Sequence, residues 1–364
     1  MSSTETLRAG IVGLGRWAAV LADAVGRGSA LELVACYTRD PERRATFAQR
    51  YACRAADSFA DLLADPAVEG VIVTTPNDTH ADLVEQAALA GKHVYTEKPI
   101  ANTLSDGTRI ADACRRAGVR LAVGHGARYA GPVQKIRELL TQGALGEVSL
   151  VEANFSNDRG LELTPDRWRW FRDNSPGGPL IQLAVHHLDT LQALFGLVTA
   201  VSAQVRRLYT RAEVDDVAVL ICGFQSGPLA YIGSSWATAG VYSINVYGTR
   251  GAVFYTVDFT HWSAADTDAH SQLLFQPRDS ADRQPVPFEA VDMYRAELDD
   301  WAAAIRADRQ PTVSASEGLA ALRLVWAALE SSETGRTVRP DSGVNEDRGA
   351  DVGPVPQPAR VAQR

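Results

Sequence analysis

Two side chains in this sequence could exchange a proton with a substrate hydroxyl, and they lie far apart in the chain. Lys98 follows a short apolar run and precedes Pro99, whose ring restricts the neighbouring backbone. Most lysines are solvated surface charges. Burial, however, lowers the pKa of a lysine until it can give and take a proton near neutral pH. The segment therefore predicts a catalytic lysine at a strand tip, with a plain surface charge as the alternative.

The second side chain is His186, in an expected helix over residues 179–195. At about 100° per residue, Gln182, His186 and Asp189 share a narrow arc of an otherwise apolar helix. Polar groups on a buried helix need partners, either one another or a ligand. We interpret the stripe as an oriented acid/base rather than a satisfied core histidine. His187 points about 100° away and is taken as structural.

A third motif predicts an anion site. An apolar run over 7–12 is followed by the sequence GLGRWA at 13–18 and then by an expected helix. Gly13 allows a sharp turn, Gly15 lets the backbone approach a pyrophosphate, and Ala18 lets the helix pack closely on the strand. The phosphates would lie on the helix N-terminus, whose free N–H groups favour an anion. Because the motif follows a strand and opens a helix, it predicts dinucleotide binding rather than an ordinary glycine turn.

The residues after the next expected strand, 31–37, bear on which dinucleotide binds. Thr38 and Arg39 follow that strand, and an arginine there can hold the 2′-phosphate of NADP. An acidic residue would instead hold the ribose hydroxyls of NAD, and Asp40 is the candidate. Asp40 followed by Pro41 is also a typical helix start. We therefore prefer NADP, with NAD as the alternative.

The elements around these residues predict two domains and a tail. Over 1–123, short apolar strands alternate with amphipathic helices, which predicts an α/β Rossmann domain with a doubly wound parallel sheet. Over 124–339, longer alternating strands joined by turns predict an α+β domain with a mostly antiparallel open sheet. This second domain would cover the crevice and select the substrate, or serve only for oligomerisation. Residues 340–364 are rich in Pro, Gly and Asp without periodicity, which predicts a disordered tail.

Composition excludes several classes of partner. The 364 residues are 46% hydrophobic with a net charge of −8, so nucleic acid is not an expected partner. The four cysteines are scattered without zinc-like spacing, and we expect no metal site and a reduced compartment. We see no signal peptide and no apolar stretch long enough to span a membrane. A cytoplasmic protein with a small-molecule substrate is expected.

The sequence resembles the Gfo/Idh/MocA oxidoreductases over nearly the whole chain except about its last 25 residues. The matching segments are GIVGLGRWA (10–18), TTPNDTHADL (74–83), AGKHVYTEKPIA (90–101), ARYAGPVQKIRELLTQGALGEV (127–148), GGPLIQLAVHHLDTLQALFG (177–196) and SSETGRTV (331–338). The resemblance implies hydride transfer between NAD(P) and a secondary alcohol or ketone of a sugar, cyclitol or related polyol. It implies catalytic roles for Lys98 and His186, with Asp189 orienting the histidine or contacting substrate. Many relatives carry Asp where Gln182 stands, and because an amide cannot carry charge, Gln182 is expected to hydrogen-bond a hydroxyl rather than relay a proton.

The residues and the resemblance together give the expected site. Expected cofactor contacts are Gly13, Gly15, Arg16, Trp17, Thr38, Arg39, Thr75, Pro76, Asn77, His80, Glu97 and Lys98. Expected substrate contacts are Lys98, Arg128, Tyr129, Arg169, Gln182, His186 and Asp189. A homodimer or homotetramer through the second domain's sheet is also expected. The alternatives are a redox-assisted lyase or glycosidase that uses bound NAD(P), and a non-catalytic NAD(P)-sensing regulator on the same fold.

Overall fold

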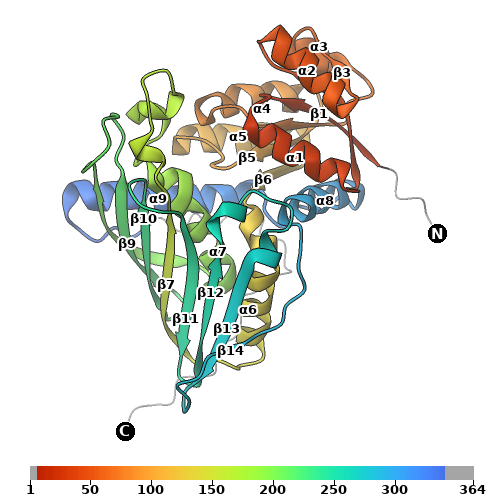
Figure 1. The fold of residues 1–364 in the computed structure, drawn as a ribbon. Coiled ribbons are helices and arrows are strands. Elements are labelled where there is room, and N and C mark those ends of the chain that lie inside the picture. The colour runs from red at the N-terminus through yellow and green to blue at the C-terminus, as the bar shows by residue number, and fades with distance from the viewer. Residues whose placement is uncertain (1–5, 341–364) are drawn as a thin grey trace.

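A computed structural model of the protein describes residues 6–340, and the tail predicted for 340–364 lies outside them but for its first residue. The first part of the chain forms a parallel sheet flanked by helices (Figure 1). Its strands are β1 (Leu7–Val12), β2 (Leu31–Tyr37), β3 (Arg54–Ala55), β4 (Gly70–Val73), β5 (His93–Glu97) and β6 (Leu121–Gly124). Its helices are α1 (Arg16–Gly26), α2 (Pro41–Tyr51), α3 (Phe59–Ala64), α4 (His80–Leu89) and α5 (Leu104–Ala117).

The strands are arranged in the order β3-β2-β1-β4-β5-β6, and every pairing in this sheet is parallel. The order reverses between β1 and β4, and in such sheets a ligand binds outside the strands' carboxyl ends at that point. The central strands are buried on both faces, which explains their continuous apolar sequence. The predicted Rossmann architecture is confirmed.

The second sheet is larger and mostly antiparallel. Its strands are β7 (Val148–Ser156), β8 (Val198–Arg206), β9 (Val217–Phe224), β10 (Leu229–Ser235), β11 (Val241–Gly248), β12 (Gly251–Val257), β13 (Ser271–Pro277) and β14 (Gln284–Pro285). The order is β14-β13-β12-β11-β7-β10-β9-β8, and β7 and β10 pair in parallel. The remaining helices are α6 (Gly131–Thr141), α7 (Val185–Phe195), α8 (Met293–Arg306) and α9 (Ala315–Thr334). The predicted mostly antiparallel open sheet is confirmed.

Helix α8 follows the second sheet in sequence but packs on the first. It contacts α1, β2, β5 and β6 (Figure 1). Its Trp301 is fully buried against β4. The ring approaches Gly70 so closely that a Cβ added to this glycine would lie 2.7 Å from it. The segment after α8 then pairs with β6, where Val123 N–H donates to the Val313 carbonyl at 2.9 Å. The sequence-based division at residue 123 therefore leaves out a helix that completes the first domain in space.

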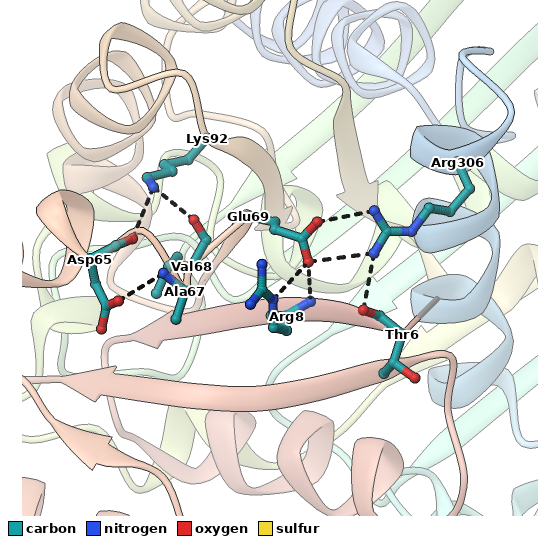
Figure 2. Close-up of polar contacts among 8 residues, drawn as sticks. All are labelled: Thr6, Arg8, Asp65, Ala67, Val68, Glu69, Lys92 and Arg306. Atoms are coloured by element: carbon teal, nitrogen blue, oxygen red, sulfur yellow. Dashed lines mark hydrogen bonds and ion pairs between the residues drawn. The ribbon is translucent and has the colours of Figure 1, made fainter. Parts of the chain in front are cut away.

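A polar cluster at the end of α8 fixes this arrangement (Figure 2). Arg306 binds the Glu69 carboxylate at 3.0 Å and the Thr6 carbonyl at 3.0 Å, and Arg8 binds Glu69 from β1. Burial alone would raise the pKa of Glu69, but hydrogen bonds from Arg306 and Arg8 outweigh it and lower this pKa to about 2. The cluster joins α8 to β1 and to the loop before β4.

This cluster gives a pH-dependent stability prediction. Since the folded-state pKa of Glu69 lies below its ordinary value, its contribution is complete above about pH 5 and is lost as pH falls towards 2. We expect Glu69→Gln to lower the free energy of unfolding by about 1–3 kcal/mol at pH 7, measured by denaturant titration. The difference from the parent protein should shrink through that acid range. Glu138→Gln, which removes an exposed pair within α6, is the control, and an equal loss there would contradict the prediction.

Among the helices in residues 6–340, none has the length and apolar character needed to cross a membrane.

Candidate active site

The glycine turn between β1 and α1 has the geometry expected of a pyrophosphate site. Gly13 has a φ of +91°, and a Cβ there would lie 2.5 Å from Thr75 Cγ2. At Gly15 an added Cβ would meet nothing within 4 Å, so this side of the turn is open. No side chain caps α1, whose first N–H groups are thus available to an anion. These residues fit the phosphates of a dinucleotide.

Beside the turn, the Arg16 and Trp17 side chains reach towards the second half of the chain. The Arg16 guanidinium donates to the Ser263 hydroxyl, and the Trp17 ring packs edge-on against Tyr294 of α8 at 5.5 Å. The side chains of this turn are therefore engaged within the protein, while the first backbone N–H groups of α1 stay available to an anion. The side chains connect the cofactor-binding turn to elements that follow it by more than 240 residues.

At the end of β2, Asp40 caps α2. Its carboxylate accepts from the backbone N–H groups of Glu42 and Arg43 at 3.0 and 3.1 Å. Arg39 is exposed beside it. An open hollow joins this strand end to the glycine turn and is lined by Leu14, Gly15, Ala19, Asp40, Glu42, Arg43, Thr46, Phe47, Arg50 and Tyr51. The helix-cap interpretation of Asp40 is therefore the one that the geometry supports.

His80 holds the backbone rather than facing a ligand. It is fully buried, its Nε2 lies 3.1 Å from the Thr75 carbonyl, and its Nδ1 lies 3.1 Å from the Pro99 carbonyl. Because its ring is fully buried and both nitrogens lie beside backbone carbonyls, His80 is not placed as the direct cofactor contact that was expected. It instead connects the end of β4 to the segment that carries Lys98. Thr75 and Pro76 remain partly exposed at the strand end.

Asn77 is also drawn inward. It is 5% exposed and donates to Asn102 at 3.1 Å, and Asn102 in turn donates to the Asp173 and Asn174 carbonyls. These bonds attach the β4 loop to the long loop of the second domain. Asn77 thus helps to hold these two loops together.

Lys98 lies directly after β5, and its ammonium reaches the residues just before α7. Its Nζ donates to the Gln182 carbonyl at 2.7 Å. Burial lowers the pKa of Lys98 to about 7; the Glu97 carboxylate opposes the shift, while Arg169 and Arg159 add to it. Glu97 is itself 7% exposed, and burial raises its pKa. Lys98 can therefore exchange a proton near neutral pH.

The segment carrying Gln182 and His186 is not one regular α-helix. Leu180–Ala184 is π-helical and leads into α7, so the arc expected from α-helical spacing is altered at Gln182. His186 is 7% exposed, and its Nδ1 is buried without a hydrogen-bond partner among the described residues. Burial and then the Lys98 charge hold the pKa of His186 well below its usual range. The imidazole is therefore neutral near pH 7 and within the electrostatic reach of Lys98.

Asp189 does not orient His186. Both its oxygens are bound by Arg128, with Nε–Oδ2 and Nη2–Oδ1 distances of 2.6 and 2.7 Å, and Asp189 is fully buried. This two-bonded ion pair joins the turn after β6 to α7. Asp189 and Arg128 therefore bind each other, in place of the substrate contacts that were expected of them. Tyr129 is likewise occupied, since its hydroxyl donates to Asp300 of α8 at 2.9 Å.

Arg169 reaches Gln182, the residue whose carbonyl accepts from Lys98. Its guanidinium stacks on the Trp168 ring at 4.0 Å, and its Nε lies 3.4 Å from Gln182 Oε1. The Gln182 Nε2 is buried without a partner among residues 6–340. Lys98, Arg169, Gln182 and His186 are thus gathered, whereas Arg128, Tyr129 and Asp189 are engaged elsewhere.

Three nearby residues were not anticipated. The rings of His125 and Trp262 lie 6.1 and 6.0 Å from that of His186, and Arg159 acts electrostatically on both Lys98 and Arg169. Burial lowers the pKa of His125 to about 4. His125 directly follows β6, so its place at a strand's carboxyl end was a usable signal. The other two come from loops whose position the sequence does not reveal.

No group of three His, Cys, Asp or Glu side chains in the described part of the chain could hold a metal ion.

A Rossmann domain whose strand-end lysine hydrogen-bonds to the Gln182–His186 segment of an antiparallel-sheet domain defines a two-domain dinucleotide-binding oxidoreductase. Residues 7–125 match the oxidoreductase family with an NAD-binding Rossmann fold, and residues 133–254 match the Gfo/Idh/MocA C-terminal domain. The chain belongs to the Gfo/Idh/MocA family of NAD(P)-binding oxidoreductases, as its sequence motifs predicted.

Individual relatives support this assignment. An oxidoreductase of Desulfitobacterium hafniense, provisionally described as NADPH-dependent, is 41% identical with a TM-score of 0.88, covering 92% of this chain and 97% of its own. The aldose-aldose oxidoreductase of Caulobacter crescentus, solved with glycerol, is 27% identical with a TM-score of 0.80 and coverages of 92% and 99%. The inositol 2-dehydrogenase of Rhizobium meliloti is 29% identical over 344 residues, 90% of this chain and 97% of that protein.

Proposed function

We propose that this enzyme transfers hydride between a nicotinamide dinucleotide and a secondary alcohol or ketone of a sugar, cyclitol or related polyol. The observation that carries the proposal is the meeting of Lys98, from the dinucleotide-binding domain, with the Gln182–His186 segment of the second domain. Relatives that act on aldoses and inositol support the substrate class. Two polar groups suited to proton exchange thus belong to one candidate site.

In this proposal the chain's own residues manage the hydroxyl proton. A nicotinamide bound beside the crevice would supply the hydride acceptor. The neutral imidazole of His186 accepts the hydroxyl proton, supported by Lys98, and Gln182 and Arg169 orient the substrate oxygens. In the reductive direction the same groups return the proton.

The test is a panel of sugars, cyclitols and their ketones, followed at the absorbance of the reduced nicotinamide with both cofactors. Hydride transfer to or from at least one polyol is expected. A redox-assisted lyase would form product without net cofactor reduction, which product analysis by mass spectrometry would reveal. Cofactor binding with no turnover of any compound would favour the regulator and contradict the proposal.

We infer a preference for NADP over NAD from the end of β2. The carboxylate of Asp40 is engaged as a helix cap, Arg39 is exposed beside it in the chain, and Arg43 lines the hollow. We expect Arg39→Gln to lower kcat/KM for NADP relative to NAD by about tenfold, from the loss of one charge-assisted contact. Arg50→Gln, which lines the same hollow but pairs with Asp23, is the control. A parent enzyme that prefers NAD would contradict the assignment.

A homodimer or homotetramer through the second sheet remains our proposal. Exposed apolar residues adjoin on its β7, β9 and β10 strands, namely Leu150, Val219, Ile221, Leu229 and Tyr231. Such a contiguous patch is typical of an interface. Light scattering of the parent protein and of Ile221→Glu would test it, with a monomeric parent contradicting the proposal. A cytoplasmic location is also proposed.

A further inference from the structure

Positively charged side chains act on one another around the candidate site, and the proposed hydride transfer does not by itself require all of them. Burial, followed by the charge of Arg16, lowers the pKa of Arg159. Burial, followed by the charge of Arg159, lowers the pKa of Arg169 to about 9. Arg159 and Arg169 both act on Lys98 as well. Arg159 and Arg169 are therefore close enough to the candidate catalytic lysine to act on its charge.

Carboxylates act on two of these charges only from beyond ion-pair distance: Glu97 on Lys98, and Asp158 and Glu162 on Arg159. Among residues 6–340, neither Arg159, Arg169 nor Lys98 forms an ion pair with a carboxylate, although other arginines such as Arg109 form several. The buried carboxylate of Asp189 is already bound on both oxygens by Arg128. Arg169 has no such carboxylate, and a largely buried cation without one is unfavourable unless an anion joins it.

Arg169 is held in an orientation that suits such an anion. Stacking on Trp168 at 4.0 Å fixes the plane of its guanidinium, and Nε is directed to Gln182 Oε1. The other N–H donors of this fork have no hydrogen-bond partner in the described residues. The same Gln182 accepts from Lys98 through its carbonyl, which places the fork close to the proposed alcohol site. A planar fork of donors matches a carboxylate or phosphate.

We propose that the substrate carries an anionic oxygen group, a carboxylate or a phosphate ester, in addition to the reacting hydroxyl, and that Arg169 binds it. The inference rests on the proposed function because it names the substrate class of the same site. Arg16 lies at the α1 end, where the dinucleotide phosphates would bind, whereas Arg169 lies at the Lys98 end. The anion at Arg169 is therefore assigned to the substrate.

The test compares matched neutral and anionic compounds: aldoses with their uronates, alditols with their aldonates, and sugars with their phosphates. We expect kcat/KM for one anionic class to exceed that of its neutral partner by about tenfold or more. Arg169→Gln should then raise KM for the anionic compound about 10–100-fold, and lower its kcat/KM at least tenfold more than that of the neutral partner. Calorimetry on the cofactor-loaded enzyme should show the same loss in binding of the anion. Uronates and aldonates test the carboxylate, and sugar phosphates test the phosphate ester.

Arg167→Gln is the matched control, because Arg167 lies on the same loop, is 71% exposed and pairs with Asp166. It should leave the ratio of anionic to neutral kcat/KM unchanged. If the parent enzyme used the neutral and anionic compounds equally well, this inference would be overturned but the proposed function would stand. An Arg169→Gln variant that weakens dinucleotide binding instead of anion binding would also overturn it, because the arginine would then serve the cofactor. If acids bind through Arg169 but no compound is turned over, the inference stands and the proposed function fails.

Discussion

Lys98→Met is expected to lower kcat by about 10²–10⁴-fold while leaving dinucleotide affinity nearly unchanged. Methionine keeps an unbranched stem but removes the ammonium that donates to the Gln182 carbonyl at 2.7 Å. The variant thus loses the group whose pKa burial has brought to about 7. Steady-state kinetics with saturating cofactor, combined with a fluorescence titration of the dinucleotide, would separate the two effects.

The pH profile provides a second readout of Lys98. Because a base must be unprotonated to help remove a proton, kcat/KM for alcohol oxidation should rise with pH and level off above about 7 in the parent enzyme. For reduction the same group must be protonated, so the dependence has the opposite sign. Lys98→Met should lack this limb, whereas His186, whose pKa is held well below its usual range, should not produce it.

Lys92→Met is the matched control for this variant. Lys92 precedes β5, as Lys98 follows it, but its ammonium donates to the Asp65 and Val68 carbonyls at 3.0 and 2.7 Å (Figure 2). Its replacement should cost stability without moving kcat or the pH profile. A Lys98→Met enzyme with parental kcat, or an equal loss of kcat in Lys92→Met, would remove Lys98 from the proposed mechanism.

His186→Asn is the second large expected effect, a fall in kcat of about 10²–10⁴-fold. Asparagine retains a hydrogen-bonding side chain in the pocket formed with Phe155 and Trp262, but it cannot take up a proton. Substrate KM should therefore change less than kcat. A solvent isotope effect on kcat in the parent enzyme that disappears in the variant would link the loss to proton transfer.

His187→Asn separates this role from a general loss of packing. His187 is fully buried, with its ring 4.8 Å from Tyr242 and 6.1 Å from Phe155. We expect a lower melting temperature for this variant with kcat reduced far less than in His186→Asn. The assignment of His186 fails if the two variants lose the same activity for the same loss of stability.

Much of the fold could be predicted because the signals are local. The strand over 31–37 was predicted with its observed bounds, and the apolar run over 7–12 coincides with β1. The glycine turn was recognisable since its φ of +91° at Gly13 requires a residue without a side chain. The alternating pattern of the later strands also predicted that the second domain is α+β with a mostly antiparallel sheet. The π-helical turn at Leu180–Ala184 was not predictable from a spacing of 100° per residue.

The candidate site was predicted in part. Lys98 and His186 were singled out by residue type and position, and Gln182 by helical spacing, whereas Arg159 was missed because it lies on an irregular loop. His80 and Asp189 illustrate the opposite error. Their residue types suit ligand binding, but the His80 ring nitrogens lie beside three backbone carbonyls and Asp189 binds Arg128, 61 residues away in the chain.

The sequence by itself determined the order of strands and helices, the glycine turn before α1 and the two candidate proton-exchanging side chains, because each depends on neighbouring residues. Only the tertiary structure decided which distant groups meet. It placed α8 on the first sheet, committed Asp189 to Arg128, and brought Arg169 and Lys98 to the same glutamine. The physical reason is that burial and charge pairing depend on how separate elements pack, and no local pattern encodes which polar groups are left without partners.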